Sequence, residues 1–266
     1  MKTLKLGIAG CGYLGNIIAD AYCNGLLEGY ELVGAISRSR ESVEKLAEKI
    51  GCKACDSIEE LLELKPDYIA EAASGQLVKD IAEKVLSHGS NLVVLSIGAF
   101  ADQAFYEKAV ETARENGTRI HIASGAIGGF DVLRTISLMS QAGNLPEQSG
   151  IETHKGPASL QGTPIFKDSL MTDTEESHVF SGNAKEAIAL FPTKVNVAVA
   201  TALATTGPEI TGVNIFSVPG FIGDDHKITA EIEGVKAVVD IYSSTSAIAG
   251  WSVVALLRNL VSPVVF

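Results

Sequence analysis

The chain has 266 residues, of which 46% are hydrophobic, so it can bury one large core or two modest ones. It carries 21 Lys and Arg residues against 32 Asp and Glu residues, for a formal net charge of −11. This acidic balance argues against nucleic acid or an anionic membrane surface as the main partner. Because no apolar run reaches membrane-spanning length and no signal-peptide pattern opens the chain, we expect a cytoplasmic location and no membrane partner.

A glycine-rich turn follows the first predicted strand. Gly10, Gly12 and Gly15 have G-x-G-x-x-G spacing, and a segment with helical periodicity comes directly after them. In such a strand–turn–helix the first glycine permits the turn, the second lets the backbone approach a pyrophosphate, and the third allows close packing. Tyr13 and Leu14 lie at the expected helix start, where free N–H groups and the helix dipole favour phosphate. The pattern predicts a dinucleotide-binding site.

The end of the second predicted strand, residues 30–37, decides between NAD and NADP. A carboxylate there binds the ribose hydroxyls of NAD, whereas a small residue followed by Arg suits the extra phosphate of NADP. This chain has Ser37 and Arg38 and no carboxylate before Glu41. We therefore expect NADP to be preferred over NAD. The alternative is that Arg38 and Arg40 are only solvated residues at the start of the next helix.

Four cysteines lie in the first fifth of the chain, which is not the pattern of an extracellular disulfide framework. Cys52 and Cys55 form a C-x-x-C, but no second pair or nearby His completes a zinc site. We expect two buried or half-buried thiols in a short edge strand, and no metal.

Strands and helices alternate through the first half of the chain at the spacing of right-handed crossover units. This alternation predicts a doubly wound parallel sheet, a Rossmann-type dinucleotide-binding domain, over residues 1–125. Ligands of such sheets sit beyond the carboxyl ends of the strands. We therefore expect Ala73, which follows the strand-like segment of residues 67–72, to contact the cofactor.

The composition changes after residue 125, where Gly, Pro and Thr interrupt strand-like pieces in the manner of antiparallel strands with ordered loops. Two helical segments and three strands follow, the last two strands joined by a tight turn at Glu233 and Gly234. Residues 126–244 are predicted to form an α+β substrate or catalytic domain. The last helix, within residues 245–266, is expected to pack back on the first domain.

His226 is the candidate acid or base. It follows the loop GFIGDD and opens a predicted strand, with Asp224 or Asp225 near enough to tune its pKa. An exposed loop histidine without chemistry is the ordinary alternative. The remaining histidines are expected to be structural; they are His88, His121, His154 and His178. The sequence has no G-x-S-x-G or H-E-x-x-H pattern, which disfavours a hydrolase or a zinc protease.

Several longer segments run along nearly the whole chain in the order found in one family. They are GCGYLG, EAASGQLVKD, LSIGAFAD, IASGAIGGFDVL, VFSGNAKEAIALFPTKVNVAVAT, DDHKI, and TS followed by LLRNL. With these segments the sequence resembles the L-aspartate dehydrogenase family. The resemblance implies a reversible NAD(P)-dependent oxidation of L-aspartate to iminoaspartate, which water converts to oxaloacetate and ammonia or which feeds NAD biosynthesis. It also implies a homodimer.

The resemblance implies functional roles for three residues of this chain. His226 matches the family's catalytic histidine, with a role in activating water and relaying protons at the imine carbon. Ala126 and Asn196 match positions that contact the cofactor.

Two departures from the family pattern concern the substrate. Lys194 stands where the family commonly has an amide, and residues 242–244 replace an Asn-Pro-Lys that precedes Thr245 and Ser246. If the missing lysine holds a substrate carboxylate, Lys194 is the candidate substitute, because a dicarboxylate needs a cation nearby. We therefore expect Lys194, Thr245 and Ser246 to contact the substrate. A related dehydrogenase acting on another small acid or a sugar is one alternative, and a non-catalytic dinucleotide redox sensor is another.

Overall fold

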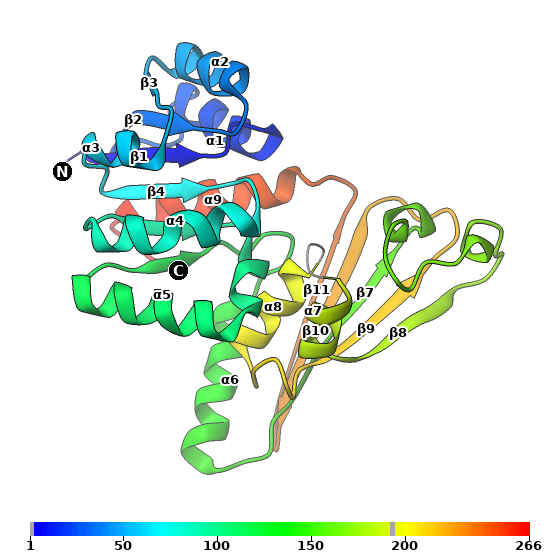
Figure 1. Ribbon diagram of the computed structural model, residues 1–266. Helices are drawn as coiled ribbons and strands as arrows, with labels where there is room; N and C mark the ends of the chain where they lie inside the picture. The colour runs from blue at the N-terminus through cyan, green and yellow to red at the C-terminus, as the bar shows by residue number, and fades with distance from the viewer. Residues whose placement is uncertain (1–2, 192–194) are drawn as a thin grey trace. The chain divides into compact units, whose positions relative to one another are not determined.

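The computed structural model describes residues 3–191 and 195–266 (Figure 1). The chain divides into two compact units, one made of residues 1–125 with Ala247–Phe266 and the other of Ala126–Ser246. We call them unit 1 and unit 2. Lys194, which the sequence nominates for substrate binding, lies outside the described residues. None of the helices in the described ranges is long and apolar enough to cross a membrane.

Unit 1 is built on a six-stranded sheet whose strands are all parallel, in the order β3-β2-β1-β4-β5-β6. The strands are β1 (Leu4–Ala9), β2 (Tyr30–Ile36), β3 (Lys53–Ala54), β4 (Tyr68–Glu71), β5 (Asn91–Val94) and β6 (Ile120–Ile122). The helices are α1 (Tyr13–Cys23), α2 (Arg40–Ile50), α3 (Ile58–Glu63), α4 (Gly75–Ser87), α5 (Gln103–Asn116), α9 (Ala247–Val261) and the 3₁₀ helix η1 (Ile97–Ala101). This is the doubly wound order in which the chain reverses direction across the sheet beside β1 and β4.

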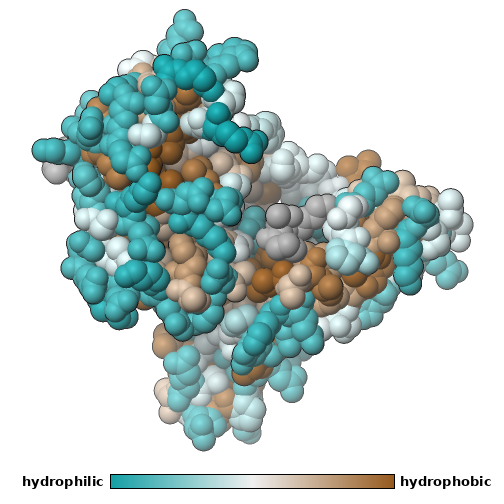
Figure 2. Space-filling model, in the orientation of Figure 1, coloured by the Kyte–Doolittle hydropathy of each residue, from teal (hydrophilic) through white to brown (hydrophobic). Residues whose placement is uncertain are grey.

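Capping residues mark where helices of unit 1 begin and end. Ser57 accepts a hydrogen bond from the Glu60 amide at the start of α3, and Ser74 accepts one from the Leu77 amide at the start of α4. Gly51 ends α2 in the left-handed conformation, with φ 79°. The outward surface over α2 and α5 is mostly hydrophilic (Figure 2), as expected of helices that bury only one face.

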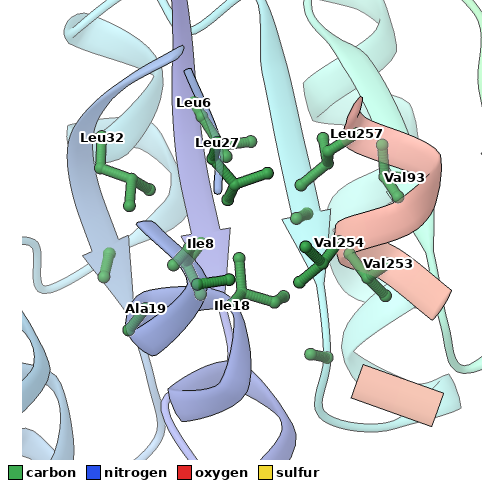
Figure 3. Close-up of a cluster of buried hydrophobic side chains, with 14 of the residues drawn as sticks. Leu6, Ile8, Ile18, Ala19, Leu27, Leu32, Val93, Val253, Val254 and Leu257 are labelled. Carbon is green, nitrogen blue, oxygen red and sulfur yellow. The ribbon is translucent and has the colours of Figure 1, made fainter. Parts of the chain in front are cut away.

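The core of unit 1 contains side chains from both the first strand and the last helix of the chain. Leu6 and Ile8 of β1 pack with Ile18 of α1. In Figure 3, Val253, Val254 and Leu257 of α9 lie on the side of the helix that faces the sheet and belong to the same buried cluster. The helix is also fixed by hydrogen bonds. Its Leu257 carbonyl accepts one from the Tyr30 hydroxyl at 2.8 Å, and Ser252 Oγ accepts one from the Gly125 amide at 2.9 Å.

Unit 2 contains a five-stranded mixed sheet in the order β11-β10-β7-β9-β8. The strands are β7 (Gln148–Lys155), β8 (Ser177–Asn183), β9 (Gly212–Ser217), β10 (Asp224–Ile232) and β11 (Val235–Ser243). The helices are α6 (Phe130–Gly143), α7 (Ala184–Leu190) and α8 (Asn196–Ala204), with 3₁₀ helices η2 (Pro157–Leu160) and η3 (Asp168–Met171). The expectation of antiparallel strands is wrong for one pair, because β7 and β9 are parallel.

One face of the unit 2 sheet is covered. Helices α6 and α8 pack against strands β10 and β7 respectively. The side chains that alternate onto this face are buried, among them Ile151 and Thr153 of β7 and Ile228 and Ala230 of β10. We call this the inner face and the opposite one the outer face.

Candidate functional site

A cavity of about 730 Å³ opens at the carboxyl ends of β1, β2 and β4 in unit 1. Its volume is that of a typical small-molecule or cofactor site. Seven of the residues nominated from the sequence line it, namely Gly10, Gly12, Tyr13, Leu14, Ser37, Arg38 and Ala73. Gly15 does not line the cavity, because it lies beneath the turn.

The glycines of the turn fit a pyrophosphate. Gly10 has φ +113°, and a Cβ there would be 2.8 Å from the Ala72 carbonyl oxygen. A Cβ at Gly15 would overlap the carbonyl oxygen of Gly10. At Gly12, by contrast, a Cβ would meet nothing within 4 Å, because that position faces the open cavity. The turn is therefore closed on the protein side and open on the ligand side, as phosphate binding by backbone requires.

The start of α1 supplies the donors for an anion. Gly12 caps the helix without a side-chain hydrogen bond, and the first turn carries no acidic residue. The first N–H groups of a helix have no intrahelical acceptor, so they remain available to a phosphate. The side chain of Asn16 donates to the carbonyls of Cys11 and Gly12, at 3.1 and 3.0 Å, and so holds the turn in place.

Glu71, at the end of β4, is a buried carboxylate that sequence analysis did not single out. Its Oε1 accepts hydrogen bonds from the amides of Ala73 and Ser74 and from the Ser96 hydroxyl, at 2.7 to 2.9 Å. Its Oε2 accepts from the amides of Leu95 and Ser96. Burial raises the pKa of Glu71, while the donated bonds stabilise its charged form. Glu71 therefore ties the loop that carries Ala73 to the end of β5.

The two arginines near the cavity, Arg38 and Arg40, differ in whether a carboxylate pairs with them. Arg38 is exposed and makes no ion pair or hydrogen bond with any residue in the described ranges. Arg40 is held by Glu44, at 2.7 Å, and by Asp56. Asp56 also lines the cavity, a carboxylate that sequence analysis missed because it lies after β3 rather than after β2. Its charge is paired with Arg40, so Arg38 is the arginine available to a ligand.

His226 is buried in a strand, which excludes the alternative of an exposed loop histidine. It is the third residue of β10, points to the inner face, and is 4% exposed. Its Nδ1 is 3.0 Å from Thr153 Oγ1 on the neighbouring strand β7. Burial lowers the pKa of His226 to about 4; Asp224 opposes this shift and Lys155 adds to it. The imidazole is thus neutral near pH 7 and fixed in orientation through one nitrogen.

Of the two aspartates expected beside His226, only one faces it. Asp224 contributes to the electrostatics of the imidazole and is 3.1 Å from Lys155 Nζ. Asp225 interacts with Asp240 instead, on the outer face; burial, and then this neighbouring carboxyl group, raise the pKa of Asp225. The alternation of side chains along β10 explains the difference.

The remaining nominated residues lie around unit 2. Thr245 and Ser246 follow the end of β11, where the Ser243 hydroxyl accepts a hydrogen bond from the Thr245 amide and donates one to its carbonyl. Since Ser243 pairs with Asp224 in the sheet register, this segment continues from the end of the sheet that carries Asp224. Asn196 is the first residue of α8 and is exposed, and Ala126 is half-buried in the loop before α6.

Two other histidines have packing roles. The rings of His154 and His178 stack on Phe216, with centroids at 4.6 and 4.5 Å. These three rings lie on the outer face, away from His226. Sequence analysis could not find Thr153 and Lys155, because only strand pairing brings them to His226.

Comparisons with known proteins bear on this architecture. Residues 10–123 match the family model "Homoserine dehydrogenase, NAD binding domain", and residues 131–260 match "Aspartate dehydrogenase, C-terminal". The chain is 32% identical to L-aspartate dehydrogenase of Methanococcus maripaludis and 31% identical to that of Methanocaldococcus jannaschii, with 98% of both chains covered in each case. The solved aspartate dehydrogenase of Thermotoga maritima matches with a TM-score of 0.78, at 26% identity over 99% of both chains.

The parallel sheet with its glycine turn, together with the NAD-binding model, defines the protein as a dehydrogenase that uses a nicotinamide dinucleotide. The full-length similarity to curated relatives is more specific than the fold. The chain belongs to the aspartate dehydrogenase family. The predicted fold class and the family resemblance are both confirmed.

Proposed function

We propose that the protein catalyses the reversible oxidative deamination of L-aspartate to oxaloacetate and ammonia through iminoaspartate, with NADP preferred to NAD. The relatives named L-aspartate dehydrogenase match over nearly the whole chain, which supports the substrate. The observation that carries the proposal is the state of His226, a neutral, buried imidazole at the position of the family's catalytic histidine. The sequence pattern supports a cytoplasmic location and the family resemblance supports a homodimer, and light scattering of the purified protein tests the subunit number.

The residues of unit 1 bind and orient the cofactor in this proposal. The amides at the start of α1 and the turn from Gly10 to Gly12 hold the pyrophosphate. Ala73, held in place by Glu71, lines the same cavity. When bound, the nicotinamide accepts a hydride from the substrate α-carbon.

His226 moves the protons. A neutral imidazole can accept a proton near pH 7, which an imidazolium cannot. The contact between Nδ1 and Thr153 Oγ1 fixes the ring, and Nε2 has no hydrogen-bond partner among the described residues. Nε2 is therefore the atom that activates the water attacking the imine carbon and that returns the proton in the reverse direction. Ala126 and Asn196 are proposed to contact the cofactor, and Thr245 and Ser246 the substrate, with Lys194 as a further substrate candidate.

The preference for NADP rests on Arg38. It lines the cavity and has no carboxylate partner in the part of the chain that the structure describes, so its charge is available to the 2′-phosphate. Ser37, beside it, is small enough to leave room for this group. The family model alone supports only a nicotinamide dinucleotide.

The test is the initial rate of nicotinamide oxidation with oxaloacetate and ammonium, measured with NADPH and with NADH. The control omits ammonium. We expect ammonium-dependent turnover that is faster at low NADPH than at equal NADH. His226→Ala should lower kcat by about a hundredfold or more with cofactor affinity nearly unchanged. The matched control His178→Ala, on the outer face, should keep wild-type turnover.

Absence of ammonium-dependent turnover in wild-type protein would overturn the substrate assignment. Unchanged turnover in His226→Ala would overturn the role of the imidazole. A panel of other amino acids and small sugars, tested in the oxidative direction, would then identify the substrate class.

A further inference from the structure

Lys155, the last residue of β7, is a half-buried cation beside His226. Its side chain is 17% exposed, and its Nζ is 3.1 Å from Asp224 Oδ1. In the pairing of β7 with β10, Lys155 lies opposite Asp224 and Thr153 lies opposite His226. Because alternate residues of a strand share a face, Lys155 and Thr153 both belong to the inner face. On the inner face, the pair of Lys155 and Asp224 is therefore the next one along the sheet from the pair of Thr153 and His226.

The N–H donors of the Lys155 ammonium group are not used by hydrogen bonds within the described residues. Its three N–H groups donate to no residue in the described ranges, and the contact with Asp224 is an ion pair without hydrogen-bond alignment. Asp224 Oδ1 is itself buried and accepts no hydrogen bond from those residues. A partly buried ion pair offsets its desolvation only when further hydrogen bonds satisfy it. The pair is thus incomplete, and the Lys155 ammonium group has N–H donors left for an anionic ligand.

No other cation in the described strands of this sheet shares the inner face. Lys227 of β10 and Lys236 of β11 alternate onto the outer face, where they pair with Glu152 and Glu231. Besides Asp224, the polar residues at the Lys155 end of the inner face are Ser217 of β9 and Ser243 of β11, both uncharged. Among the described strands of this sheet, Lys155 is therefore the cation that can neutralise an anion on the face where His226 lies.

We propose that Lys155 binds a carboxylate of the substrate and that Asp224 orients its ammonium group. The ligand class is a small dicarboxylate, in which the carboxylate on Lys155 brings the reacting carbon toward Nε2 of His226. This inference rests on the proposed function and deepens it, because it assigns the cation that the two departures from the family pattern leave open. It places that cation on β7 instead of at Lys194.

The experiment compares Lys155→Met with Lys227→Met, the same change on the outer face, where the lysine is 46% exposed. Steady-state kinetics give KM for oxaloacetate and for NADPH. Loss of a charge-assisted hydrogen bond should raise KM for oxaloacetate about tenfold or more in Lys155→Met, with KM for NADPH within about twofold. Lys227→Met should match wild type. Lys155→Arg, which keeps the charge, should recover part of the loss and serves if the Met variant does not fold.

Calorimetric titration with succinate, an unreactive dicarboxylate, gives a readout that does not depend on turnover. We expect wild type and Lys227→Met to bind it and Lys155→Met to bind it about tenfold more weakly or worse. Equal succinate affinity and equal KM for oxaloacetate in Lys155→Met would overturn the inference. The same loss in Lys194→Met with none in Lys155→Met would also overturn it.

The proposed function can fail separately. If wild-type protein shows no ammonium-dependent turnover yet binds succinate through Lys155, the reaction assignment fails and the carboxylate site stands. If turnover is present and indifferent to Lys155, the reaction stands and the site fails.

Discussion

At the scale of single residues, burial determines the protonation state of His226. The pKa of His226 lies near 4 in the folded protein and near 6.5 in the unfolded chain. Between these values the unfolded state binds more protons than the folded state, so the free energy of unfolding rises with pH. The contribution of His226 is complete above about pH 6.5 and is lost as the pH falls toward 4.

The expected size of this effect is about 3 kcal/mol, from the difference between the two pKa values. Urea unfolding at a series of pH values between 4 and 7.5 measures it. His226→Asn should remove that part of the pH dependence, whereas His88→Asn, at the exposed end of α4, should keep it. An identical pH dependence in wild type and His226→Asn would show that the pKa of the imidazole is the same in the folded and unfolded protein, so that burial does not shift it.

Arg38 gives the second prediction at this scale. Arg38→Glu places a carboxylate beside the cavity, where it repels a 2′-phosphate and can accept hydrogen bonds from ribose hydroxyls. We expect the ratio of kcat/KM for NADPH to that for NADH to fall by about tenfold or more. Arg134→Glu, an equal change of charge on the exposed side of α6, should leave the ratio unchanged. The same ratio in wild type and Arg38→Glu would show that the phosphate does not meet Arg38.

At the scale of elements, the Glu71 side chain joins two loops that the backbone does not connect. All five of its partners are donors, so a carboxylate satisfies them and an amide does not. Glu71→Gln would turn an NH₂ group toward amide N–H groups in either orientation.

We expect Glu71→Gln to lower the free energy of unfolding by about 2 kcal/mol or more, because buried donors lose their acceptor. NADPH should also bind more weakly, since Ala73 and Ser74 line the cavity. Denaturant unfolding and fluorescence titration with NADPH measure the two effects. Glu111→Gln, on the exposed side of α5, is the control for the loss of one charge. Wild-type values of both quantities in Glu71→Gln would contradict the role of the carboxylate.

Local signals predicted elements well where the cause is local. The tight turn expected at Glu233 and Gly234 depends on a few neighbouring residues, and it is found between β10 and β11. The parallel pairing of β7 with β9 was not predicted, because nothing within either strand records a partner about 60 residues away.

The same limit applies to the candidate site. The glycine turn was predictable as a unit because its residues are consecutive, and His226 came from its loop and from the family resemblance. Thr153 and Lys155 were missed because they reach His226 only through the register of β7 on β10. Glu71 was missed for a similar reason, since its partners come from two loops.

At the scale of the whole molecule, unit 1 is completed only by the end of the chain. Helix α9 follows all of unit 2 in sequence, yet Val253, Val254 and Leu257 are buried with β1 and α1 (Figure 3). The unit that carries the proposed cofactor cavity therefore depends on residues more than 120 positions beyond Gly125. A core change in α9 should act on cofactor binding through the stability of unit 1.

Leu257→Ala tests this dependence. Leu257 is fully buried and its carbonyl accepts the Tyr30 hydroxyl, so truncation should lower the free energy of unfolding by about 2 to 5 kcal/mol. Under the proposed function NADPH binds folded unit 1 and not the unfolded chain, so saturating cofactor should restore part of the lost melting temperature. Leu138→Ala, at an exposed position of α6, should change stability by less than about 0.5 kcal/mol. If Leu257→Ala melts like wild type, or if NADPH protects wild type but not the variant, α9 does not complete the core of the cofactor-binding unit.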